Sequence, residues 1–108
     1  MKNRDYFKLI EDLQAKGLAI MGMKNADYAE DGNPFKNFDL VEPMCNISSE
    51  KGIHIRMTDK MTRIGNLLDR EGEVKDESIE DTILDLANYS LILLAKIKSR
   101  KDEKMLYN

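Results

Sequence analysis

The segment from residue 76 to 98 constrains the fold more than any other part of the chain. Its first half carries carboxylates at Glu77, Asp81 and Asp85, each four residues after the last. That spacing places side chains on one face of an α-helix. Its second half, within 83–97, is apolar almost all the way round. Because a helix that is apolar on all sides has to be covered on all sides, we predict a long helix that is acidic on one face and buried towards its end.

The rest of the chain also has the periodicity of helices. Apolar residues recur every three or four positions on both sides of a loop that contains Gly32 and Pro34, and no run alternates as a half-buried strand does. We therefore predict an all-α fold, a small bundle of about four helices in a single domain. Within residues 1–108 we expect a first helix over 1–26, a loop and short helix over 27–47, a basic-striped helix over 48–70 with an N-cap within 48–50, the acidic and apolar helix over 76–98, and a polar tail over 99–108.

The charge balance and the cysteine content narrow the class of protein. A net charge of −3 over 108 residues gives no general attraction to long nucleic acid or to an anionic membrane. Cys45 is the only cysteine, so no intrachain disulfide forms. The start of the chain lacks the apolar run of a signal peptide, and the block 83–97 is too short to span the ~30 Å of a bilayer. We predict a cytoplasmic protein with no membrane partner.

A basic stripe runs along the predicted helix 48–70, opposite its apolar side. Residues at spacings of three and four form it: Arg56, Asp59, Lys60, Arg63, Asn66 and Arg70. Such a stripe can bind phosphate oxygens, Arg through its planar fork and Lys as a point charge. We predict that Arg56, Lys60 and Arg63 bind phosphate. The alternative is an ordinary solvated helix face.

The acidic stripe needs partners of its own. Asp85 lies among apolar neighbours, and a carboxylate in such surroundings needs a compensating charge. One candidate is the basic stripe, which the carboxylates would brace through salt bridges. The other is Mg²⁺, which prefers oxygen ligands and keeps waters and substrate phosphates in its shell. In that second interpretation the metal ligands are Asp59, Glu77, Asp81 and Asp85.

Aromatic and amide side chains gather on both sides of the Gly32 loop. Asn25 and Tyr28 lie before the loop, next to Lys24, and Phe35, Asn37 and Phe38 lie after it. Aromatic faces stack on a nucleobase, and amide groups hydrogen-bond to its edge. Tyr28, Phe35, Asn37 and Phe38 are our candidates for a base pocket, and Lys24 and Asn25 are further candidates for ligand binding. The alternative is that the phenylalanines belong to the core and the asparagines cap helices.

Taken in order, segments 24–28, 32–38, 52–68 and 76–89 resemble a known phage family. They are similar to the first of the numbered nucleotide modification associated domains of phages and prophages, over residues 20–95. The resemblance implies a role in phage nucleotide metabolism, exercised in the cytoplasm of the host cell.

The last of these segments also resembles the second metal-binding helix of MazG-type nucleotide pyrophosphohydrolases, with Asp81, Asp85 and Tyr89 in the matching positions. That family has a tight cluster of glutamates on its first helix. Here Lys60 and Arg63 stand in the corresponding helix, beside Asp59 and Asn66. This departure favours direct binding of phosphate over metal-dependent hydrolysis.

Three hypotheses follow. The first is a nucleotide-binding protein that holds a phosphorylated nucleotide without turning it over, with no cofactor and no catalytic residue; in a phage this includes sequestering a cyclic-nucleotide defence signal. The second is a Mg²⁺-dependent nucleoside triphosphate pyrophosphohydrolase. The third is a helical protein-interaction module. A pocket in so small a chain has to be shared between subunits, so we expect a homo-oligomer with 83–97 as its interface.

Overall fold

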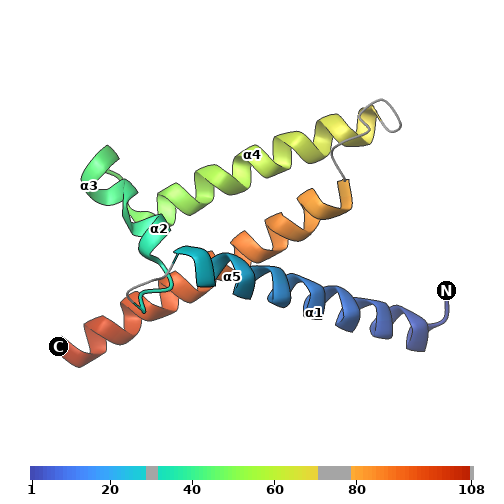
Figure 1. Ribbon diagram of the computed structural model, residues 1–108, viewed down its shortest axis with the longest axis horizontal. Coiled ribbons are helices and arrows are strands. Elements are labelled where there is room, and N and C mark those ends of the chain that lie inside the picture. The colour runs from blue at the N-terminus through green and yellow to red at the C-terminus, as the bar shows by residue number, and fades with distance from the viewer. Residues whose placement is uncertain (29–31, 71–78, 108) are drawn as a thin grey trace.

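The computed structural model describes residues 1–28, 32–70 and 79–107, with the side chains of 26–28 and 105–107 excepted. The described residues form helices and contain no strand, so the predicted all-α class is confirmed. Figure 1 shows α1 (Asn3–Tyr28), two short helices α2 (Lys36–Asp39) and α3 (Val41–Cys45), and the long helices α4 (Ser49–Asp69) and α5 (Ile79–Tyr107). None of the helices in these ranges has an apolar stretch that would reach across a bilayer.

The framework of the molecule is the pair formed by α4 and α5. These helices run in opposite directions and pack against each other, while α1 crosses α5 (Figure 1). The first half of α1 extends away from the other helices. Among the described apolar side chains only Ile53, which is fully enclosed, and Leu67 are buried, so the core is small and lies along α4.

The start of α4 follows from its local sequence. The hydroxyl of Ser48 accepts a hydrogen bond from the Lys51 N–H at 3.1 Å, which satisfies one of the unpaired donors of the first turn and confirms the predicted N-cap. One turn later Gly52 lets α3 approach closely. A Cβ at this position would lie 2.9 Å from Cγ2 of Val41, so any larger residue would push α3 away.

Two predicted segments differ in the structure. The short helix expected within 27–47 is two helices, α2 and α3, with Leu40 between them. The polar segment predicted as a tail over 99–108 is helical as far as the structure describes it, because α5 continues without a break through Ser99 to Tyr107. At its start Arg100 forms salt bridges with Glu42 at 2.7 Å and Glu50 at 2.8 Å. These pairs hold the polar end of α5 against α3 and α4.

Candidate functional site

A cavity of about 590 Å³ lies between the second half of α1, the segment that leads into α2, and helices α4 and α5. Six of the nine residues predicted to bind a ligand line it: Lys24, Asn25, Phe35, Asn37, Phe38 and Arg56. They come from three separate stretches of the chain. Their convergence on one hollow is what a binding site assembled by the fold requires.

Asn33 sets the path of the chain into this cavity. Gly32, whose φ of 77° lies in the left-handed region that favours glycine, turns the chain. The Asn33 carboxamide oxygen then accepts a hydrogen bond from the Phe35 N–H at 2.9 Å, and its amide group donates to Asp39 at 3.2 Å. The short local hydrogen bonds of an asparagine therefore position Phe35 and the start of α2.

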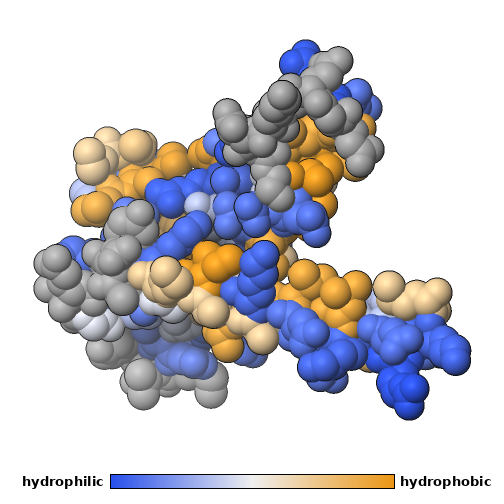
Figure 2. All heavy atoms as spheres, turned by 45° about the vertical axis from the view of Figure 1, so that its right-hand side comes forward, coloured by the Kyte–Doolittle hydropathy of each residue, from blue (hydrophilic) through white to orange (hydrophobic). Residues whose placement is uncertain are grey.

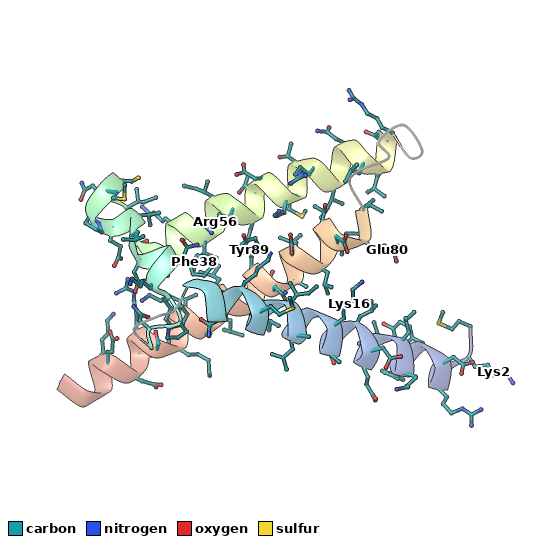
Figure 3. All side chains as sticks on the ribbon, viewed as in Figure 1. Lys2, Lys16, Phe38, Arg56, Glu80 and Tyr89 are labelled. Carbon is teal, nitrogen blue, oxygen red and sulfur yellow. The ribbon has the colours of Figure 1, made fainter. Side chains whose placement is uncertain are left out.

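Aromatic rings and a guanidinium group form one wall of the cavity. The rings of Phe38 and Tyr89 meet edge to face, with centroids 6.2 Å apart. The Arg56 guanidinium carbon lies 4.9 Å from the centroid of the Phe38 ring, within the range of a cation–π contact. Figure 3 shows these three side chains, from α2, α4 and α5, close to one another. The positive charge of Arg56 therefore lies over one face of the Phe38 ring.

Asp85 lines the cavity from α5 and is paired with two lysines. Its carboxylate lies 3.3 Å from the Lys60 ammonium and 3.5 Å from that of Lys24. The prediction that the acidic stripe braces the basic one is confirmed for Asp85 and Lys60. Lys24 is an additional partner, contributed by α1. Arg56 is held differently, since its guanidinium lies over the Phe38 ring.

Several predicted residues lie away from the cavity or outside the described part of the chain. Lys60 and Arg63 do not line the cavity, although Lys60 reaches its edge through Asp85. The Tyr28 side chain and all of Glu77 lie outside the described residues.

Asp59, Asp81 and Asp85 were the other three candidate metal ligands. Within the described ranges, no three side chains of His, Cys, Asp or Glu come together in a way that could hold a metal ion. These three aspartates therefore make no ligand set by themselves, and the Asp85 carboxylate already has two ammonium partners.

Sequence reasoning missed the residues that hold in place the segment 35–39, which contains Phe35 and Phe38 and is called the aromatic segment below. The buried Lys96 ammonium forms a salt bridge with Asp39 at 3.1 Å and lies 4.9 Å from the centre of the Phe35 ring. The hydroxyl of the buried Ser49 donates to the same carboxylate at 2.6 Å. One signal could have revealed Lys96, because it is the only charged residue in the apolar run 90–97.

These contacts determine the ionisation of Asp39. Partial burial by itself would raise its pKa, but hydrogen bonds from Ser49, Lys96 and Asn33 and the charge of Lys96 outweigh this effect. The pKa of Asp39 is therefore lowered from its ordinary value of 3.8. The carboxylate is charged at neutral pH and pairs with the Lys96 ammonium.

Asn88 joins α1 to α5 at the edge of the cavity. Its amide group donates a hydrogen bond to the Gly17 carbonyl oxygen at 3.0 Å. A Cβ on Gly17 would lie 3.0 Å from the Asn88 side-chain oxygen and 3.2 Å from Leu84, so the absence of a side chain permits this close crossing. Asn88 and Tyr89 both line the cavity, and neither was among the predicted ligand-binding residues.

Comparison with known proteins gave one match. A family model with the description Nucleotide modification associated domain 1 matches residues 24–97, which includes every described residue of α2 to α4 and most of α5. Searches of curated proteins and of solved structures gave no match. The match covers more than half of the chain and contains all the cavity residues contributed by α2, α4 and α5, so this chain belongs to the Nucleotide modification associated domain 1 family.

Proposed function

We propose that this protein binds a phosphorylated nucleotide in the cavity and holds it without turning it over. The observation that carries the proposal is the wall where the Phe38 and Tyr89 rings adjoin the Arg56 guanidinium. A nucleotide joins a flat aromatic base to an anionic phosphate, and this wall offers a complement to each. The family match, which links the domain to nucleotide modification, agrees with this class of ligand.

The base would occupy the apolar part of the cavity. Small-molecule sites are mostly apolar, with volumes of about 300–1,000 Å³, and the cavity volume lies within that range. Phe35 and Phe38 supply aromatic surface for stacking, while the amides of Asn25 and Asn37 can both donate and accept hydrogen bonds at the edge of the base. Asn88 adds a third amide at the α1 side.

The phosphate would bind at Arg56, with Lys24 as a second cation. Arg56 is half-buried and its guanidinium lies over a ring face. A guanidinium stacked in this way still has donors at its edge for phosphate oxygens. Asp85 would orient Lys24 and Lys60 around the phosphate, as a brace rather than as a metal ligand.

Holding without turnover is the form of function that this arrangement supports. Metal-assisted hydrolysis needs carboxylates free to bind Mg²⁺ and activate water, whereas the Asp85 carboxylate is paired with two ammonium groups. In a phage, a protein of this kind would sequester a nucleotide signal of host defence, for which cyclic nucleotides are our first candidates. We also propose that the binding form is a homo-oligomer.

Isothermal titration calorimetry against nucleoside mono-, di- and triphosphates and cyclic dinucleotides, with Mg²⁺ or with EDTA, tests the proposal. The ligand is then released by denaturation and identified by chromatography. Arg56→Gln removes a charge-assisted hydrogen bond and should weaken binding about 10- to 100-fold. Arg70→Gln, an exposed residue at the end of the same helix and outside the cavity, should leave affinity unchanged.

The alternatives give different results in this experiment. Release of pyrophosphate that needs Mg²⁺ and is lost in Asp85→Ala would identify a hydrolase. Failure of every nucleotide to bind the folded protein would refute nucleotide binding and leave a protein-interaction module.

A further inference from the structure

A second hollow, an apolar groove of about 350 Å³, lies between α1 and α5. Nine of its twelve lining residues are apolar or glycine, and the others are Gln14, Glu80 and Asn88. Two of the lining residues are partly exposed to solvent: Leu13, with 40% of its surface exposed, and Ile83, with 47% exposed. Figure 2 shows hydrophobic atoms gathered along one side of the projecting part of α1 and hydrophilic atoms along the other. Covering the groove and the hydrophobic side of α1 would therefore remove apolar surface from water.

The isolated chain exposes far more surface than a compact protein of its mass. Its accessible surface is 8587 Å². A monomer of 12.4 kDa would expose about 6,100 Å², so the excess is about 2,500 Å². A standard interface covers about 800 Å² on each partner, and obligate homodimers cover more. The excess is thus of the size that an obligate interface between chains would remove.

The shape of the chain leads to the same conclusion. The radius of gyration is 16.5 Å, against about 13 Å for a compact domain of this length. The extended part is the first half of α1, where every residue from 1 to 9 is exposed, including Phe7. Most of the stability of a helix in a protein comes from packing its apolar face, which this half of α1 lacks within one chain.

We infer that a second copy of this chain packs across the groove, against α1 and α5. A second copy has the same apolar groove and the same exposed α1. One symmetric contact would therefore bury the apolar face of α1 in both chains. The exposed side of α1 carries both charge signs, as in the Lys8–Asp12 pair, and the net charge is small, so two copies do not repel strongly. The groove differs from the predicted interface, which was the whole block 83–97, because Lys96 in that block is buried against Asp39.

The second copy would also close the nucleotide cavity. Leu18, Met21, Asn88 and Leu91 line both the groove and the cavity, so a chain lying in the groove would form part of the cavity wall. This second step rests on the proposed nucleotide binding, whereas the contact between copies does not.

Light scattering after gel filtration, with sedimentation velocity over a range of protein concentrations, measures the mass of the intact chain. We expect twice the 12.4 kDa of one chain. Leu13→Glu, which lines the groove but not the cavity, should halve the mass while circular dichroism stays helical. Ile55→Glu on α4, 53% exposed and outside both hollows, is the matched control and should remain a dimer.

A wild-type chain that stays monomeric at every concentration overturns the inference without any variant. Dissociation by Ile55→Glu but not by Leu13→Glu would place the contact elsewhere and also overturn it. Nucleotide titration separates the two proposals. A dimer that binds no nucleotide refutes nucleotide binding and leaves the interface. A monomer that binds a nucleotide refutes the interface and the homo-oligomer and leaves nucleotide binding.

Discussion

Replacing Asp39 by asparagine tests how strongly the aromatic segment is held. The substitution preserves shape and allows the Ser49 hydroxyl to keep a partner, but it leaves the buried Lys96 ammonium without the carboxylate 3.1 Å away. Breaking a buried ion pair costs about 3–5 kcal/mol, and an exposed one about 0–1 kcal/mol. Because the Asp39 side chain is 29% exposed, water screens part of the charge, and we expect a loss of about 2 kcal/mol in the free energy of unfolding.

Urea unfolding followed by circular dichroism at 222 nm measures this loss. All proteins are compared at one concentration, because association shifts apparent stability. The matched control is Asp12→Asn, the same chemical change in the exposed Lys8–Asp12 pair, whose N–O distance is 2.9 Å. It should cost at most about 0.5 kcal/mol. Equal losses in the two variants would refute the reasoning that burial makes the Asp39–Lys96 pair important.

The same pair predicts a pH dependence with a definite sign. Because the pKa of Asp39 is lowered in the folded protein, its charged form stabilises the fold at pH values above the unfolded pKa. That contribution is lost as the pH falls from about 4 through the lower folded value. The difference in stability between wild type and Asp39→Asn should therefore be constant near neutral pH and shrink below about pH 4. A difference that grows on acidification would contradict the proposed pairing.

Two further predictions concern helix contacts and can be checked by thermal melts. Gly65→Ala, whose Cβ meets nothing within 4 Å, should stabilise the protein by about 0.5–1 kcal/mol through helix propensity. Gly52→Ala should destabilise it by about 1–3 kcal/mol, because the added Cβ overpacks against Val41. Equal effects of the two substitutions would contradict this reasoning. Asn88→Ala should cost about 1 kcal/mol by removing the hydrogen bond to Gly17, and it should loosen α1 in hydrogen exchange without affecting α4.

The features that sequence reasoning located correctly depend on neighbours in the chain. Helical periodicity and the Ser48 cap act within a turn or two, so they placed α4 to within a residue. The Lys60–Asp85 pair could also be predicted from the sequence, because two charged stripes of opposite sign on consecutive helices tend to face each other. Phe35, Phe38 and Arg56 were chosen from residue type and line one cavity, while ligand binding by them stays a prediction.

The features that were missed depend on contacts between distant parts of the chain. Arg100 finds its partners 50 and 58 residues away, and nothing near residue 100 indicates that they exist. The sequence there is polar and resembles a frayed end, yet these pairs keep it helical. The role of Tyr89 and Asn88 in lining the cavity likewise depends on how α1 crosses α5, which no periodicity specifies.

Helix α5 is used on two sides at once. Asp85, Tyr89 and Lys96 share one side, which contributes to the cavity and anchors the aromatic segment, and Ile83 and Ala87 on the opposite side belong to the groove. A rigid rod transmits a small rotation or shift from one side to the other. Substitutions on different sides of α5 should therefore fail to combine additively, in contrast to the usual behaviour of distant sites. For the same reason this helix leaves few positions free to vary, so the lining of the cavity would change more readily in α1 and in the segment before α2.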